Sequence, residues 1–306
     1  MTGEFESTVR DAGEVAVVRR IRSLLSGGEG LVIGPGDDCA AIARDDTWLG
    51  LLKTDCVIEG VHFAPGTEPE RVGRKAMARA LSDIAAMGGL PEHALITLAT
   101  GPKRFVSEIE GWYRGMVDMA ARFGCTIAGG ETSTLPGPGA LIAVSLTGRV
   151  ERDRCLRRGT ARLGDRIAVT GRLGNSFESG RHLDFVPRIP QARWLAEREP
   201  GQRPTSMMDL SDGLGQDLPR LLEGVGGYEL DLASMPCHDG LPPEKAIRDG
   251  EDYELLLTVP PQGADRLFAD WAGAFPDIPL TGVGWVVAQT ERPLEGGWEH
   301  FRSSGT

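Results

Sequence analysis

The residues of this sequence best suited to chemistry are carboxylates that stand beside glycine or at the edges of short apolar runs. They recur along the chain at Asp37, Asp38, Asp55, Asp83, Glu131, Asp209 and Asp212. Carboxylates that converge repel one another, which raises their pKa values and costs stability unless cations neutralise them. Mg²⁺ takes oxygen ligands and usually binds one or two carboxylates together with substrate phosphates. If the fold brings these acids together, the pattern predicts a site for magnesium and phosphate chemistry.

Each of these acids, taken alone, also has a structural explanation. An aspartate after glycine commonly forms a turn, as Asp37 would after Gly36. Ser211 and Asp212 precede an apolar stretch, which is typical of a helix N-cap. A carboxylate-rich structural domain that binds no nucleotide therefore stays open as an alternative.

The sequence lacks the familiar catalytic signatures. It has no Walker A loop, no kinase glycine-rich loop and no GxGxxG after a predicted strand. Its five histidines are too dispersed to indicate a zinc site, and its five cysteines form no CxxC pair. We therefore expect neither zinc nor disulfides, and we interpret the cysteines as small buried apolar residues.

Charge and hydropathy exclude further classes of partner. The 306 residues carry a formal net charge of −11, which argues against non-specific binding to nucleic acid, because that requires a basic surface. No apolar run approaches the roughly 18 residues that a membrane-spanning helix needs. The acidic N-terminus also lacks the apolar core of a signal peptide. We expect a cytoplasmic protein with no membrane partner.

Alternating helices and strands must position the acids. We expect helices over residues 8–26, 69–87, 105–123 and 188–198. We expect strands over residues 31–33, 48–55, 95–99, 126–128, 141–147, 165–171, 253–259 and 280–287. Asp55 would then end a strand, and Asp83 would lie inside a helix. The arginine-rich stretch 151–162 is interpreted as a linker between two domains of α/β or α+β class, 1–150 and 151–306.

Short motifs follow one another in order from end to end of the chain. They are Gly3-Glu4-Phe5, Gly36-Asp37-Asp38-Cys39-Ala40, Thr54-Asp55, Glu59-Gly60-Val61-His62-Phe63, Leu81-Ser82-Asp83-Ile84-Ala85-Ala86-Met87-Gly88, Gly129-Gly130-Glu131-Thr132, Asp209-Leu210-Ser211-Asp212-Gly213-Leu214, Gly250-Glu251-Asp252-Tyr253-Glu254 and Trp298-Glu299-His300-Phe301. In these motifs the sequence resembles the thiamine-monophosphate kinase family of the aminoimidazole-ribonucleotide (AIR) synthase superfamily. The resemblance implies an AIR-synthase-like fold, in which a mixed sheet of the N-terminal domain forms a homodimer and a C-terminal α+β domain closes over the nucleotide.

The same resemblance implies a reaction. The γ-phosphoryl group of ATP would pass directly to thiamine monophosphate, assisted by several Mg²⁺ ions, to give thiamine diphosphate. Because the acceptor is a phosphate that is already ionised at neutral pH, we assign no catalytic general base. Two alternatives stay open: another ATP-dependent enzyme of the superfamily, and a nucleotide-binding descendant with reduced activity.

Roles for single residues also come from the resemblance. The implied Mg²⁺ ligands are Asp38, Thr54, Asp55, Asp83, Glu131, Asp209 and Asp212. The implied contacts to ATP are Thr54, Tyr113, Gly130, Glu131, Arg158 and Ser211. The implied contacts to the thiamine phosphate are His62, Glu251 and Trp298, whose indole offers a flat face to a cationic ring. The sequence departs from the family pattern in several places: Lys53 stands where a small hydroxyl residue is usual, and Glu131 where an aspartate is usual. Arg79-Ala80 stands in place of a Val-Asn pair, Asp249 in place of a glycine, and the segment 174–188 is short for the family. An ammonium group at position 53 could replace one ion or repel it.

Overall fold

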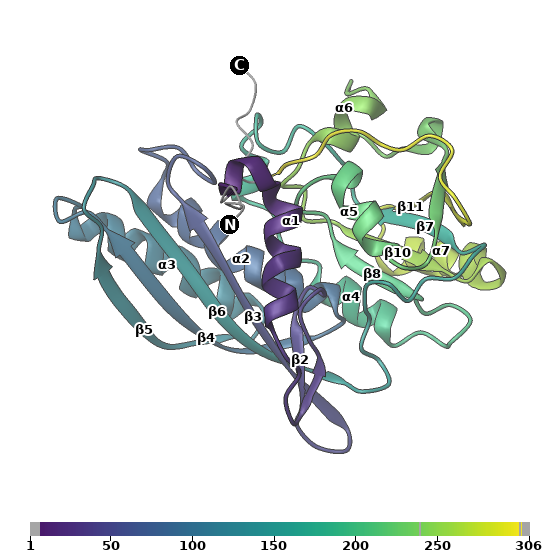
Figure 1. Cartoon of the computed structure of the whole chain (residues 1–306), viewed down its shortest axis with the longest axis horizontal. Coiled ribbons are helices and arrows are strands. Elements are labelled where there is room, and N and C mark those ends of the chain that lie inside the picture. Colours follow the sequence, from purple (N-terminus) through teal and green to yellow (C-terminus); the bar gives the residue numbers. More distant parts are fainter. Residues whose placement is uncertain (1–6, 239, 300, 302–306) are drawn as a thin grey trace, which may run out of the picture.

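Two β-sheets lie side by side in the computed structural model, which describes residues 7–238, 240–299 and 301 (Figure 1). The first sheet contains β1 (Leu31–Ile33), β2 (Ala40–Ala43), β3 (Trp48–Ile58), β4 (Leu90–Thr100), β5 (Thr126–Thr134) and β6 (Ala140–Glu151). Its strand order is β1-β2-β3-β6-β4-β5, and neighbours are antiparallel except for β4 and β5. The expected mixed sheet is therefore confirmed.

One face of the first sheet is covered by α2 (Pro69–Ala86), against which α3 (Val106–Arg122) packs. Pro69 begins α2 at a position where a proline loses no helical hydrogen bond. The two helices approach closely because glycines face them: a Cβ on Gly73 would lie 1.9 Å from the carbonyl oxygen of Trp112. A Cβ on Gly115 would likewise lie 2.0 Å from the carbonyl oxygen of Glu70. A side chain at either glycine would force the helices apart.

The opposite face of the first sheet is open. Side chains alternate between the two faces of a strand, so Leu51 and Val57 of β3 are buried under α2 while Leu52 and Ile58 are exposed. Leu95 of β4 lies on the open face too, with 53% of its surface exposed. Apolar side chains are thus left on a face that no helix covers among the described residues.

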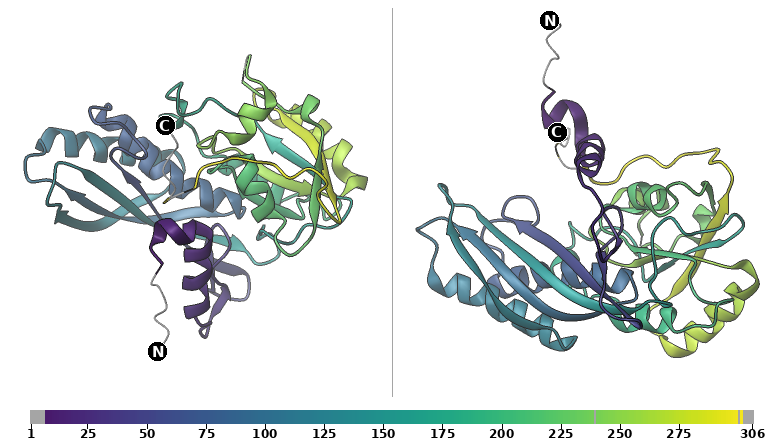
Figure 2. Two further views of the ribbon diagram at one scale, coloured as in Figure 1. Left: turned by 45° about the horizontal axis from the view of Figure 1, so that its top comes forward. Right: turned by 60° about the horizontal axis from the view of Figure 1, so that its bottom comes forward.

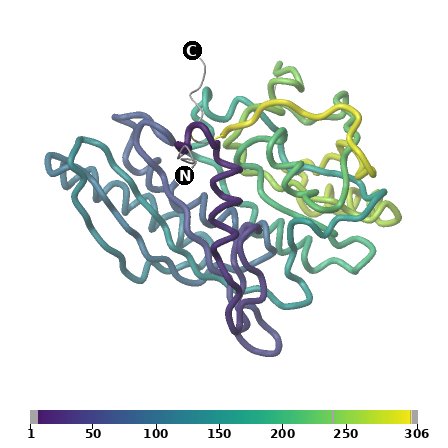
Figure 3. The backbone as a smooth tube through the Cα atoms, viewed as in Figure 1, coloured from purple at the N-terminus to yellow at the C-terminus, as the bar shows by residue number. Residues whose placement is uncertain are grey.

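The second sheet is antiparallel throughout. It contains β7 (Arg166–Thr170), β8 (Ser206–Asp209), β9 (Gly227–Leu230), β10 (Leu255–Val259) and β11 (Leu280–Val287), in the order β8-β10-β7-β11-β9. Its helices are α4 (Ile189–Ala196), α5 (Leu214–Leu221), α6 (Pro243–Arg248) and α7 (Pro261–Ala274). After β11 the chain crosses back toward α1 (Val9–Leu24), as the yellow tube in Figure 3 shows.

Helix α2 joins the two halves of the molecule (Figure 2). It contacts α4 and β8 of the second half as well as β3 and β6 of the first. The buried core around it accordingly continues from Leu81 and Ile84 into Leu195 of α4 and Trp271 of α7. A residue on α2 is therefore well placed to take part in a site between the two sheets.

Several sequence predictions need correction. Asp55 does not end its strand, because β3 continues through its pairing with β6 to Ile58. The glycine pair at 129–130 does not follow a strand but lies inside β5, which pairs with β4 as far as Thr134. Strands β2, β8 and β9 and helices α5, α6 and α7 were not among the predicted elements. The motif Gly3-Glu4-Phe5 and His300 lie outside the described residues. None of the helices described here has the length and apolar character needed to cross a membrane.

Candidate active site between the two sheets

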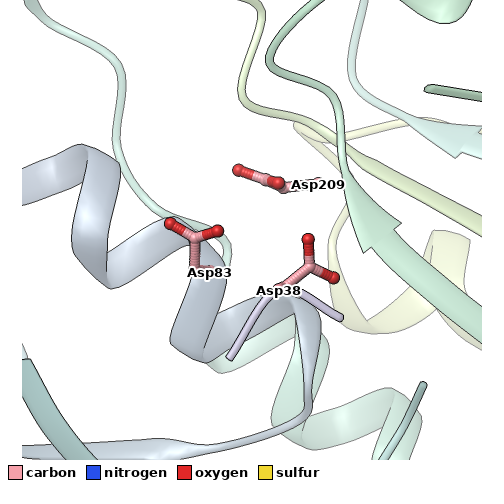
Figure 4. Close-up of side chains that lie close together, drawn as sticks. All are labelled: Asp38, Asp83 and Asp209. Carbon is pink, nitrogen blue, oxygen red and sulfur yellow. The ribbon is translucent and has the colours of Figure 1, made fainter. Parts of the chain in front are cut away.

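Three carboxylates from distant parts of the chain meet between the sheets (Figure 4). Asp38 follows β1, Asp83 lies near the end of α2, and Asp209 is the last residue of β8. One oxygen of each carboxylate lies within 4.8 Å of the others, and all three side chains are buried. We call these residues the acidic triad. The structure thus brings together three of the predicted metal ligands.

The electrostatics of the acidic triad favour a bound cation. Burial and the neighbouring charge of Asp38 together raise the pKa of Asp209 to about 6. Burial likewise raises the pKa of Asp83 well above its usual range, although the charge of Lys53 opposes this. Oδ2 of Asp38 is buried and has no hydrogen-bond partner among the described residues. The three residues fit Mg²⁺, because a divalent cation would satisfy this oxygen and offset the repulsion.

Two basic side chains approach the carboxylates from the first half of the molecule. Nζ of Lys53, on β3, lies 2.6 Å from Oδ1 of Asp83. Arg79, one helical turn before Asp83, donates two hydrogen bonds of 3.2 and 3.3 Å to the two oxygens of Asp55. Asp55 is therefore held by a guanidinium group, beside the acidic triad and not within it.

Two arginines hold further acids from the second half. Arg158, in the stretch between the sheets, pairs with Asp38 of the acidic triad. Arg220 of α5 pairs with Asp212. The predicted ATP contact Arg158 and the predicted metal ligand Asp212 are thus both engaged in ion pairs at this site.

A cavity of about 650 Å³ adjoins these residues and is lined by all three predicted substrate contacts. These are His62, Glu251 and Trp298, and Ser211 and Asp212 line the same cavity. Its aromatic rings come from Phe177, Tyr253, Trp298 and Phe301. The volume and the mixture of apolar and polar groups suit a small-molecule ligand.

The loop that carries Glu251 is tied to the loop that follows β8. The backbone N–H of Glu251 donates to the carbonyl oxygen of Ser211 at 2.7 Å, and that of Tyr253 donates to Leu210 at 2.7 Å. Glu251 and Tyr253 have φ angles of 66° and 51°, in the left-handed region that residues with a side chain adopt at a cost. Backbone strain of this kind is concentrated at functional sites, so it supports a binding role for this loop.

A fully buried lysine orients Glu251. Lys75 of α2 donates to the carbonyl oxygen of His62 at 2.6 Å, pairs with Glu251, and lies 2.6 Å from Nδ1 of His182. Burial lowers the pKa of Lys75 to about 8, although Glu251 opposes this. Burial alone would raise the pKa of Glu251, but the hydrogen bond with His182 and the charges of Lys75 and Arg79 lower it to about 2. Because the two pKa values bracket neutral pH, the ion pair is charged at pH 7.

The lowered pKa of Glu251 predicts how the stability of the protein changes in acid. Since the carboxyl group of Glu251 has a lower pKa in the folded state than its ordinary 4.5, its charge contributes stability that is present above pH 4.5 and is lost as the pH falls toward 2. We expect the difference in unfolding free energy between the protein and Glu251→Gln to shrink over this range in urea titrations. Glu178→Gln, in an exposed ion pair, is the control. A difference that is the same at pH 7 and pH 3 would contradict this prediction.

Four of the predicted site residues lie away from the acidic triad and the cavity. Thr54 and Glu131 are exposed on the open face of the first sheet, where cross-strand register aligns Glu131 with Thr97, Ala143 and Cys56. Gly130 lies on β5, three strands from Asp55 and so roughly 14 Å away. Tyr113 packs against the core from α3. Within one chain these residues do not reach the acidic triad, and their roles stay predictions.

Sequence reasoning assigned no role to Lys75, Arg79 or Asp217. Lys75, Arg79 and Asp83 are spaced four residues apart, and this spacing places charged groups on one face of an apolar helix. That signal was available. Asp217 accepts hydrogen bonds of 3.0 and 2.9 Å from the backbone N–H groups of Ser211 and Asp212 and so fixes that loop, but no pattern distinguished it.

Comparison with known proteins shows which family and which fold the chain shares. Residues 36–150 match the family described as AIR synthase related protein, N-terminal domain. The chain is 37% identical over 281 residues to the thiamine-monophosphate kinase of Rhodopirellula baltica, with 85% of each protein covered. It is 33% identical over 289 residues to that of Escherichia coli strain K12, again with 85% of each covered. The solved structure of AaThiL complexed with AMPPCP and TMP is 29% identical, with a TM-score of 0.81 over 97% of this chain and 100% of that one.

The fold and the site therefore define an enzyme with the AIR-synthase-like fold. Within that class, the chain belongs to the thiamine-monophosphate kinase family. The predicted family, fold class and enzyme class are confirmed.

Proposed function

We propose that the protein transfers the γ-phosphoryl group of ATP to thiamine monophosphate and releases thiamine diphosphate and ADP. The observation that carries this proposal is the adjacency of the cavity to the acidic triad. Arg79 lines the cavity one helical turn before Asp83, and Asp212 lines it three residues after Asp209. The AaThiL structure, which holds an ATP analogue and TMP on the same fold, supports the same pairing of ligands.

The cavity suits the acceptor in both charge and shape. Its lining includes the guanidinium groups of Arg79 and Arg248, which match the planar geometry of phosphate oxygens. The indole of Trp298 can stack on the cationic thiazolium ring of the substrate. We therefore place the thiamine moiety toward Trp298 and its phosphate toward the acidic triad.

The reaction requires two anions, the phosphates of ATP and of thiamine monophosphate, to approach each other. Burial, together with the charge of Arg79, lowers the pKa of His62 to about 4, so this histidine is neutral at pH 7. The acceptor phosphate is already ionised, and we assign no general base. We propose that Asp38, Asp83 and Asp209 hold Mg²⁺, which supplies charge neutralisation for the phosphates when bound. Arg158 and Ser211 are the proposed contacts to ATP in this half of the site.

The open sheet face suggests a homodimer. It carries exposed apolar side chains together with Thr54 and Glu131, two residues whose predicted roles the single chain does not fulfil. We propose that two copies pair through this face, so that residues 1–150 form a dimerisation and nucleotide domain and residues 151–306 form the C-terminal domain. Sedimentation equilibrium should then give twice the chain mass of 32.8 kDa.

The direct test incubates the protein with ATP, Mg²⁺ and thiamine monophosphate and separates the products by chromatography. Thiamine diphosphate that disappears on adding EDTA would support the proposal. The basic side chains paired with Asp38, Asp55 and Asp83 favour one alternative, a nucleotide-binding descendant with reduced activity. ATP binding without thiamine diphosphate would support that alternative and refute the kinase.

Replacing Trp298 by alanine should weaken substrate binding more than ATP binding. Its backbone N–H donates to the carbonyl oxygen of Asp212 at 2.8 Å, so the chain position survives while the ring is lost. Loss of a cation–π contact of about 1–2 kcal/mol predicts that KM for thiamine monophosphate rises on the order of tenfold. Trp285→Ala, at an exposed tryptophan outside the cavity, is the control. Equal increases in KM for both substrates would contradict this placement of the thiamine moiety.

A further inference from the structure

The position of Lys53 in the site is unusual for a lysine. It lies on the face of β3 that packs against α2, with only 20% of its side chain exposed. Its ammonium group contacts Oδ1 of Asp83 at 2.6 Å. Lysine is rarely buried without a partner, and here the partner is a carboxylate that the acidic triad needs for a metal ion.

Arg79 occupies the neighbouring position in the same manner. Its guanidinium contacts both oxygens of Asp55, at 3.3 Å through Nε and 3.2 Å through Nη2. It also lies 3.3 Å from Oε1 of Glu251, and only 13% of its side chain is exposed. Because the guanidinium group contacts both carboxylate oxygens, it occupies the positions at which a metal ion would bind Asp55.

The balance of charge limits how many metal ions the site can hold. Five carboxylates converge here: Asp38, Asp55, Asp83, Asp209 and Glu251. Four basic side chains pair with them: Lys53, Lys75, Arg79 and Arg158. One divalent cation more than compensates the remaining negative charge. A second would lie against an ammonium or a guanidinium group, where like charges repel strongly in a poorly solvated site.

We propose that Lys53 is a built-in cation that replaces a second metal ion at Asp83, so that the acidic triad binds a single divalent cation before nucleotide arrives. Arg79 fills the corresponding role at Asp55. This inference rests on the proposed function, because the ion that remains is the one that would face the phosphates of ATP. The ammonium group contributes a fixed positive charge that needs no metal from solution.

The test counts Mn²⁺ ions on the full-length protein without nucleotide, using electron paramagnetic resonance of the free ion. We expect one tightly bound ion per chain. Lys53→Ser removes the ammonium group and leaves a small oxygen ligand, and it should raise the count to two. Lys103→Ser, at an exposed lysine away from the site, should leave the count at one.

Either of two results would overturn the proposal: two tight ions on the unmodified protein, or an unchanged count in a folded Lys53→Ser variant. If that variant does not fold, the count on the unmodified protein still decides. Arg79→Val, which removes the guanidinium group from Asp55, then provides a second variant on which bound ions can be counted. The count is independent of turnover. One ion without thiamine diphosphate formation would refute the proposed function alone, whereas two ions with normal turnover would refute only the role of Lys53.

Discussion

Replacing Asp83 by asparagine is expected to lower kcat for thiamine diphosphate formation by about 10³-fold, the loss typical of removing one preorganised electrostatic contact from a transition state. Asp83 is the member of the acidic triad that also contacts Lys53, so its loss removes a metal ligand and the counter-charge of the ammonium together. The phosphates of both substrates would then face a site with less bound cation and a misplaced lysine. Steady-state rates at saturating Mg²⁺ measure the effect.

The control for Asp83→Asn must separate chemistry from folding. Asp118→Asn removes a carboxylate from the exposed surface of α3, where it pairs with Arg122, and should leave kcat within a factor of two or so. Asp83→Asn leaves the ammonium group of Lys53 without its buried counter-charge, so some loss of stability is expected, and thermal melts establish that the variant is folded at the assay temperature. If Asp83→Asn is folded at the assay temperature and keeps its turnover, Asp83 is not a principal ligand.

The acidic triad was within reach of sequence reasoning for a physical reason. Asp38 and Asp83 stand in short motifs with strong local character, a turn after a strand and an apolar helix. The strand that ends at Asp209 was not predicted, and Asp209 was selected from its motif with Ser211 and Asp212. Local patterns of this kind fix secondary structure without knowledge of the tertiary fold. The helix that carries Asp83 was predicted to within a residue at its C-terminal end, because glycines and a proline follow it.

The basic side chains that pair with these acids could not be predicted from the sequence. Lys53 and Thr54 are neighbours in the sequence, yet one faces the acidic triad and the other the open surface, because a strand turns successive side chains to opposite faces. The ion pair between Lys53 and Asp83 spans 30 residues of sequence, and that between Arg158 and Asp38 spans 120. Contacts of this kind depend on how the two sheets meet, which no local pattern encodes.

Replacing Lys75 by methionine should destabilise the protein and weaken binding of thiamine monophosphate together. Methionine keeps most of the volume of the lysine but leaves Glu251 without its buried partner. Breaking a buried ion pair in this way costs about 3–5 kcal/mol, and the remaining contact with Arg79 favours the lower end of that range. Urea unfolding measures the first effect, and KM for each substrate measures the second, which should rise for thiamine monophosphate more than for ATP.

A double variant distinguishes an unpaired charge from a packing defect. If the uncompensated carboxylate causes the loss, Lys75→Met combined with Glu251→Met should recover much of the unfolding free energy, since both charges are then absent. Substrate affinity should stay low, because the carboxylate that faces the cavity is gone. Lys245→Met, which breaks the exposed pair with Glu178, should cost at most about 1 kcal/mol. If the double variant is no more stable than Lys75→Met, the loss of stability comes from packing around α2. Lys75 would then not be the residue that orients Glu251.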